Sequence, residues 1–306
     1  MKIEEKIKII QQLSQLTQTQ LAARLSVSFP TLNSWINGKS QPHTKKAETI
    51  NELYKKLTGQ KVIPTNQITA KKDIILKKSK KFKSIIEIIN SRPDIHDQLV
   101  LSFTYNTNSI EGSTLTENET AAILFQNTTF KNKDLIEHLE AKNHQSALEY
   151  LFSRINKKFK ITEELILELH KILMNSIRPD AGTYRSHGVR IVGANVPTVN
   201  YIKIPKLMSD LTIEINKKSK DTISQAAIIH SKFEQIHPFS DGNGRIGRLI
   251  MAAMLMKEGI APAVIKKQKK HLYYKALQKS QQKQEFEGLD EFICDAILNG
   301  FEIIEA

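Results

Sequence analysis

Residues 237–248 bring several side chains that can act on a phosphate ester into one short stretch. The sequence there is His-Pro-Phe-Ser-Asp-Gly-Asn-Gly-Arg-Ile-Gly-Arg. His237 can accept a proton near neutral pH, and Asp241 can hold a hard cation through oxygen. Arg245 and Arg248 lie three residues apart, so on a helix both guanidinium groups can emerge on one face. A base, a metal ligand and two cations are the groups that attack on a phosphate requires.

Two predicted helices position this stretch. Apolar side chains spaced three and four apart predict an amphipathic helix over residues 222–236, and the wholly apolar run 249–256 predicts a buried helix. A loop that contains Gly242 and Gly244 therefore leads directly into a helix N-terminus. Backbone N–H groups and the positive end of the helix dipole converge at such a point, which suits a phosphate group.

Two other loop types are excluded for this stretch. A Walker loop needs Lys and then Ser or Thr after its glycines, but Arg245 follows Gly244. An EF-hand loop fails because Arg245 replaces an oxygen ligand and Ile246 replaces the required glycine. A loop of solvated charges with a helix-capping histidine is the remaining alternative, and the tight spacing of so many suited residues disfavours it.

Residues 237–245 resemble the signature of the Fic domain, H-P-F-x-[D/E]-G-N-G-R, at every position, and Arg248 matches a second arginine that often follows. The resemblance covers roughly residues 94–304. It implies an all-α, Fic-type helical bundle with one β-hairpin flap. It also implies transfer of AMP from ATP to a Ser, Thr or Tyr hydroxyl of a target protein, with pyrophosphate as the leaving group.

The resemblance implies a role for most of the signature. His237 would be the catalytic base, and Mg2+ would be held by Asp241 together with the phosphates of ATP. A later Tyr-Tyr-x-x-Leu segment matches the tyrosines that line the adenine pocket of the family. The implied nucleotide-binding residues are Asp241, Gly242, Asn243, Gly244, Arg245, Ile246, Gly247, Arg248, Tyr273 and Tyr274.

An inhibitory helix is expected near residues 97–112. In Fic proteins the pattern Ser/Thr-x-x-x-Glu-Gly/Asn marks this helix, and Thr107, Glu111 and Gly112 match it. A carboxylate beside Arg248 can form a strong pair with the guanidinium group that the γ-phosphate needs. We therefore expect Glu111 to inhibit within its own chain, with two alternatives left open: a purely structural pair, or the positioning of water for removal of AMP.

A β-hairpin is the one expected departure from helix. Residues 189–192 and 198–204 are β-prone runs that flank a Gly-Ala-Asn turn at 193–195. By the resemblance this hairpin is the flap, which holds the target segment by strand addition. The flap residues are Val189, Arg190, Ile191 and Val192.

Composition limits the class of protein. Hydrophobic residues make up 40% of the 306 residues, which supports a packed core. The single cysteine excludes a disulfide framework and indicates a reducing compartment. The first residues lack the apolar core of a signal peptide, and no run is long enough to span a membrane. We expect a cytoplasmic protein without a membrane partner.

Charge is distributed unevenly along the chain. Residues 1–83 contain 17 Lys/Arg and 5 Asp/Glu, a net charge of +12, whereas the rest of the chain carries only +1. This asymmetry indicates contact with a polyanion, nucleic acid first. We predict an N-terminal domain over 1–57, a basic linker over 58–83 and the Fic domain over 84–306.

The N-terminal segment resembles the Cro/repressor-like (XRE) family. Short helices are predicted from Thr17 and from Phe29, and the second ends in Trp-Ile-Asn-Gly, a pattern typical of a helix-turn-helix. The sequence has Ser26 where the family usually has glycine. A helical module that binds protein or only dimerises is the alternative to DNA binding. By the resemblance, the DNA-contacting residues are Gln18, Phe29, Thr31, Asn33 and Ser34.

The sequence thus predicts a protein adenylyltransferase that is autoinhibited by Glu111, modifies a target protein or itself, and binds DNA to regulate its own expression. The alternative is a DNA-binding transcriptional regulator whose Fic domain senses a nucleotide or uses another nucleotide donor. Phosphate transfer, as in the related Doc kinases, is disfavoured because the segment 242–245 (Gly-Asn-Gly-Arg) is intact. A homodimer is compatible with either hypothesis.

Overall fold

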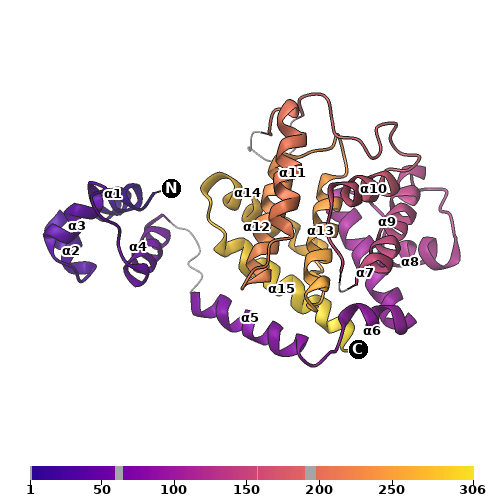
Figure 1. Ribbon diagram of the computed structural model, residues 1–306, viewed down its shortest axis with the longest axis horizontal. Helices are drawn as coiled ribbons and strands as arrows, with labels where there is room; N and C mark the ends of the chain where they lie inside the picture. Colours follow the sequence, from indigo (N-terminus) through magenta and orange to yellow (C-terminus); the bar gives the residue numbers. More distant parts are fainter. Residues whose placement is uncertain (1, 59–64, 157, 190–197) are drawn as a thin grey trace. The chain divides into compact units, whose positions relative to one another are not determined.

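All regular elements in the computed structural model are helical within the residues that it describes, 2–58, 65–156, 158–189 and 198–306. The predicted all-α fold is therefore confirmed over these residues (Figure 1). None of the described helices combines the length and the apolar composition needed to cross a bilayer.

The chain divides into two compact units, Met1–Gln67 and Ile68–Ala306. The described helices of the first unit are α1 Ile3–Ser14, α2 Gln18–Arg24, α3 Phe29–Ile36 and α4 Thr44–Leu57. They enclose a small core of their own, in which Trp35 is buried as an apolar packing residue.

Local chemistry fixes the α2–α3 turn of the first unit. A capping box begins α2, in which the Thr17 hydroxyl accepts from the Gln20 N–H at 3.2 Å and the Gln20 side chain accepts from the Thr17 N–H at 2.9 Å. At the start of α3 the Ser28 hydroxyl accepts from the Thr31 N–H at 3.3 Å. Between them, Ser26 takes a φ of +52°, the left-handed conformation that glycine adopts most easily. Serine thus closes the turn without a glycine.

The second unit is a helical bundle around α13. Its α-helices are α5 Thr65–Ser79, which starts before the unit boundary, α6 Ile85–Ser91, α7 Pro93–Glu111, α8 Glu117–Gln126, α9 Leu135–Arg154, α10 Glu163–Leu173, α11 Ile204–Ile215, α12 Thr222–Ile236, α13 Asn243–Lys257, α14 Lys270–Lys283 and α15 Glu287–Ile304. Two short 3-10 helices, η1 Tyr201–Lys203 and η2 Lys267–Lys269, precede α11 and α14.

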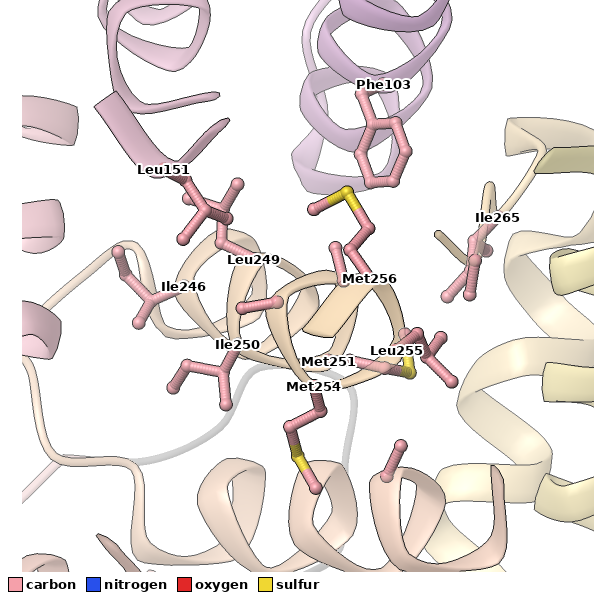
Figure 2. Packing of buried hydrophobic residues seen from close by; sticks show 14 of the residues in the cluster. Phe103, Leu151, Ile246, Leu249, Ile250, Met251, Met254, Leu255, Met256 and Ile265 are labelled. Atoms are coloured by element: carbon pink, nitrogen blue, oxygen red, sulfur yellow. The ribbon is translucent and has the colours of Figure 1, made fainter. Parts of the chain in front are cut away.

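Helix α13 is the central element of this bundle. It packs against α12, α10, α7 and α6, and its apolar run Leu249–Met256 is buried on all sides. Figure 2 shows these side chains leaving the helix in several directions, within the core cluster that also contains Phe103, Leu151 and Ile265. Because α13 is fixed all round, the loop that leads into it is anchored at one end by the core.

Helix α5 occupies most of the segment that the sequence assigned to a basic linker. Lys71 pairs with Asp295 at 2.6 Å, and Lys72 pairs with Asp290 at 3.0 Å and with Asp221 at 2.7 Å. These acidic partners on α15 and before α12 explain why the second unit begins at residue 68, earlier than the expected boundary at 84. The two lysines are thus engaged inside the unit.

The predicted β-hairpin is wrong over its second run, residues 198–204. Residues 198–200 form no strand, and η1 and α11 occupy the positions that follow. The Asn200 side chain accepts from the Ile202 N–H at 3.0 Å and starts η1, and Pro205 suits the first turn of α11. Capping therefore overrides the β-prone composition. Arg190, Ile191 and Val192 lie outside the described residues, and Val189 is not in a strand.

Gly300 is the position where a methyl group would disturb the bundle most. A Cβ there would overlap the backbone oxygen of Pro262, which no side-chain rotation can relieve. We expect Gly300→Ala to lower the free energy of unfolding by about 1–3 kcal/mol, as overpacking of a core usually does. Gly288→Ala on the same helix meets nothing within 4 Å and is the matched control. Thermal unfolding of the two variants should differ, and equal transitions would contradict the close packing of α15.

Candidate active site

His237 ends α12 in a conformation that presents its imidazole to the loop. Its φ is +51°, and its N–H donates to the Phe233 carbonyl at 2.9 Å. The ring Nδ1 lies 3.3 Å from the carbonyl oxygen of Glu234. Since a carbonyl oxygen can only accept, Nδ1 carries the hydrogen and Nε2 keeps a free lone pair. The imidazole is therefore in the tautomer that a general base needs.

The charge state of His237 follows from its surroundings. Burial is the main cause that lowers its pKa, and the Arg185 guanidinium lowers it further. The Glu234 carbonyl and the carboxylates of Glu111 and Asp241 act in the opposite direction without reversing the shift. His237 is thus neutral at pH 7 and able to accept a proton.

The loop between His237 and α13 is held by Asn243 and His170. The Asn243 amide bonds both backbone groups of Phe239, accepting from its N–H and donating to its carbonyl at 2.9 Å each. His170 stacks on the Phe239 ring with 3.7 Å between centroids. Its Nδ1 accepts from the Gly182 N–H at 2.9 Å, so Nε2 donates to the Asp241 carbonyl at 3.1 Å. Both polar atoms of the Asn243 side chain are therefore bonded within the loop. A phosphate at this residue would bind the backbone N–H.

The N-terminus of α13 forms a cradle that a carboxylate already occupies. Gly242 has a φ of +78°, and Gly244 lies so close to Glu111 that a Cβ at this position would overlap its Oε1. The absence of a side chain at 244 thus admits an anionic group to the first turn of the helix. This is the point where the helix dipole and the N–H groups favour negative charge.

Arg248 is the cation that holds this carboxylate. It is 3% exposed and donates through Nε to the Thr107 hydroxyl and through Nη2 to Glu111 Oε1. Thr107 and Glu111 lie four residues apart on α7, so one helix face presents both acceptors. Gly112 then ends α7 with a φ of +118°. Thr107 and Glu111 of the expected inhibitory pattern therefore contact Arg248 on α13, and Gly112 ends the helix that carries them.

Arg245 pairs with Glu140, an acid that belongs to no motif of the sequence. Its Nη1 donates to Glu140 Oε1 on α9 at 2.6 Å, and its Nη2 lies 3.7 Å from Asp241 Oδ1. Arg245 is 2% exposed. Glu140 stands 105 positions away in the chain on a helix without a recognisable motif, so only the fold could reveal the pair.

Asp241 is the acid of the loop, and its carboxylate is open to solvent. Its side chain is 53% exposed, and Oδ1 accepts from the Gly242 N–H at 2.6 Å. The described residues contain no group of three His, Cys, Asp or Glu side chains that could hold a metal ion alone. A cation at Asp241 would therefore need further oxygens, such as those of a polyphosphate.

A buried polar cluster lies behind Arg248. His230 Nε2 and the Tyr273 hydroxyl are 2.6 Å apart, and both residues are almost fully buried. Burial raises the pKa of Glu234 to about 8, so this carboxyl is protonated at pH 7. Of the two tyrosines predicted for the nucleotide pocket, Tyr273 packs inside and Tyr274 is 39% exposed. His230 and Glu234 were not anticipated as site residues because they lie on the buried face of α12.

Each of the two units contains a segment that matches a family of known proteins. Residues 160–255 match the Fic/DOC family, and residues 8–58 match the helix-turn-helix family. The chain is 37% identical over 177 residues to the protein adenylyltransferase Fic of Nematostella vectensis, covering 56% of this chain and 41% of the relative. The corresponding protein of Aedes aegypti is 35% identical over 179 residues, covering 57% and 36%. The chain thus spans about two fifths of the length of these curated relatives.

Solved structures share the fold. A Fic domain containing signaling protein from Bacteroides thetaiotaomicron superposes with a TM-score of 0.66 at 24% identity, over 77% of this chain and 97% of that chain. Fic-1 from C. elegans superposes with a TM-score of 0.65 at 22% identity, over 87% and 78%. The chain therefore carries a Fic domain in its second unit, preceded by a helix-turn-helix domain of the XRE type.

Proposed function

We propose that the second unit is a protein adenylyltransferase. His237 Nε2 takes the proton from a Ser, Thr or Tyr hydroxyl, and the oxygen attacks the α-phosphorus of ATP. The bond from that phosphorus to the bridging oxygen breaks, and pyrophosphate leaves. The observation that carries the proposal is the neutral imidazole of His237 on the loop that opens into the anion cradle at Gly244.

Three groups would hold the nucleotide. Backbone N–H groups at the start of α13 would hold the inner phosphates, Arg248 would bind the outer phosphates, and the open ring of Tyr274 would face the adenine. Mg2+ fits the exposed Asp241 carboxylate because this ion takes one or two protein oxygens and completes its shell with phosphate and water. When bound, it would neutralise phosphate charge during the transfer.

Glu111 is proposed to inhibit this reaction. Its carboxylate lies over Gly244 and pairs with Arg248, the positions that the phosphates of ATP require. Two anions cannot share one guanidinium Nη2 and one helix N-terminus, so ATP must displace Glu111 to bind productively. The whole contact lies within the second unit, so the proposed inhibition is intramolecular.

The experiment that tests the activity compares two labels. The Glu111→Gly variant is incubated with a host lysate and with ATP labelled at either the α- or the γ-phosphate, and the lysate without the variant gives the background. Adenylyl transfer predicts that the variant adds label from the α-position only, with a mass increase of about 329 daltons on the modified residue. Label from the γ-position alone would show a kinase and would contradict the proposal.

The pH dependence of transfer should reflect the lowered pKa of His237. Its free form is the base, so activity falls when pH drops through the pKa of the folded protein and His237 takes up a proton. Because that pKa is lowered, we expect the acid limb of kcat/KM below pH 6.5, the ordinary range of histidine. A limb at or above that pH would be incompatible with His237 as the buried base.

A second candidate function, DNA binding, rests on the first unit. Phe29 is 45% exposed in the first turn of α3, and Asn33 is exposed one turn later. Gln18 at the start of α2 and Thr31 and Ser34 on α3 are partly exposed. A second helix that presents such side chains after a tight turn suits entry into the major groove. We propose that this unit binds an operator and regulates the expression of its own chain.

Selection from a random pool of DNA duplexes tests this function. The full chain should enrich a defined sequence, and Asn33→Ala should weaken binding to it about 5- to 150-fold, the effect of losing one base contact. Gln12→Ala, at an exposed polar position on α1, is the matched control. Failure to enrich any sequence at low salt would leave protein binding or dimerisation as the role of this unit.

A further inference from the structure

Glu234 is a buried carboxyl that the proposed transfer does not use. It lies on α12 where this helix packs against α13, and only 8% of the residue is exposed. Within the part of the chain that the structure describes, its Oε1 is enclosed and has no hydrogen-bond partner. An unpaired buried oxygen costs free energy, and folded proteins contain few of them. A carboxyl in this place therefore calls for an explanation beyond packing.

The sequence of α13 makes room for this carboxyl. A Cβ at Gly247 would lie 2.7 Å from Glu234 Oε1 and 3.0 Å from the His230 ring. Gly244, three residues earlier, admits Glu111 to the same helix in the same way. Residues three apart are neighbours on a helix surface. Two glycines therefore let two carboxyls approach the first turns of α13.

Both carboxyls act on a single guanidinium, that of Arg248. Its Nη2 donates to Glu111, whereas its Nη1 is buried, lies 3.1 Å from the Cβ position of Gly244 and has no partner among the described residues. One buried cation between two ionised carboxyls would leave an uncompensated negative charge, so one carboxyl stays neutral. Glu111 forms the ion pair and its side chain is 30% exposed, which leaves the more deeply buried Glu234 as the neutral one.

Glu234 is the member of this buried cluster whose charge can change near neutral pH. Burial is the largest cause that raises its pKa to about 8. Tyr273 and Tyr274 face the cluster from α14 as neutral hydroxyls, because burial raises their pKa values as well. His230, on α12 itself, is neutral because burial lowers its pKa to about 3. These three groups therefore keep their charge state while Glu234 titrates.

We propose that Glu234 holds a proton while an anion occupies Arg248 and releases it when that anion leaves, an inference that rests on the proposed binding of ATP at Arg248. Removal of Glu111 leaves a buried cation without its partner, and Glu234 compensates it by ionising. The triphosphate of ATP then brings negative charge back to the guanidinium, and Glu234 takes a proton from solvent. Nucleotide binding is thus coupled to proton uptake once Glu111 is removed.

Calorimetry of ATP binding measures this coupling. The chain carries Glu111→Ala to free Arg248, and His237→Ala to prevent turnover and titration of the imidazole. Titrations in buffers of different ionisation enthalpy give the number of protons taken up. We expect the further substitution Glu234→Gln to remove about one bound proton. It should also remove a fall in ATP affinity of up to about tenfold per pH unit over about pH 6–9. Glu258→Gln, at an exposed position after α13, is the matched control and should remove neither.

The charge of Glu234 can also be followed without nucleotide. In a chain labelled with 13C at the glutamate carboxyls, Glu234→Gln identifies the resonance by its loss. With Glu111 present we expect this resonance to titrate near pH 8. In Glu111→Ala it should titrate at lower pH, because the negative charge that raises the pKa of Glu234 is gone while Arg248 still lowers it.

The outcomes distinguish this inference from the proposed function. The coupling is refuted if Glu234 titrates at the same pH with and without Glu111, or if ATP binds and Glu234→Gln leaves the proton count unchanged. Glutamine resembles the neutral acid, so Glu234→Gln should keep the melting temperature of the parent chain at pH 7. A large drop would show that Glu234 is ionised beside Glu111, which also refutes the proposal. If ATP binds to none of the variants, the transferase proposal fails, and the 13C titration still decides whether Glu234 responds to the charge at Arg248.

Discussion

His237→Ala is expected to abolish transfer from α-labelled ATP, with a loss of at least about 10²- to 10⁴-fold, the usual contribution of a general base. The alanine variant removes the only group proposed to take the proton from the target hydroxyl. Its backbone turn is held by the Phe233 carbonyl and by Arg185, so the loop should persist. Label incorporation and nucleotide binding are measured on the same preparation.

The control for this variant is His187→Ala. His187 is exposed, and its carbonyl, which the substitution keeps, accepts from Arg185 Nη1 at 2.6 Å. We expect nucleotide binding to be retained in both variants and transfer only in the control. Transfer by His237→Ala at the parental rate would remove this histidine from the mechanism, and the enzyme proposal would lose its base.

Glu111→Gly is expected to increase self-labelling by roughly 10- to 150-fold, the factor that corresponds to one charge-assisted hydrogen bond of about 1.5–3 kcal/mol. The substitution frees Arg248 Nη2 and clears the space above Gly244. Both changes favour the phosphates of ATP over the internal anion. The initial rate of label incorporation at a fixed ATP concentration is the measurement.

Two further substitutions separate the charge of Glu111 from backbone effects. Glu111→Ala removes the carboxylate but avoids a second glycine beside Gly112, so it should activate as glycine does. Glu111→Gln keeps the volume and loses the charge, and it should activate less because an amide still fills part of the cradle. If none of the three variants raises the rate, Glu111 has no inhibitory role and its pair with Arg248 is structural.

The part of the site that the sequence predicted is the part whose residues are close together in the chain. Helix α12 has the predicted bounds because its apolar spacing is regular and Asp221 caps it through the Ser224 N–H. The pairing of Glu111 with Arg248 was expected only through the resemblance, since 137 positions separate the two residues.

The remaining features depend on contacts across the fold. Glu140 and Arg185 belong to no motif, and their partners lie on other elements that composition cannot place beside them. In the sequence Lys71 and Lys72 belong to a basic run without nearby acids. In the fold they pair with Asp295 and Asp290 on α15. The hairpin was predicted from β-prone residues, whereas the Asn200 side chain starts a helical turn in the same place.

The attachment of Glu111 to the same folded unit as Arg248 has a quantitative consequence. Glu111 stands on α7, which packs against α13, so its effective concentration at Arg248 is set by the fold and dilution of the protein does not change it. If Glu111 inhibits, ATP must compete with an internal anion that is always present at the site. The enzyme would then respond to nucleotide supply and remain insensitive to its own abundance.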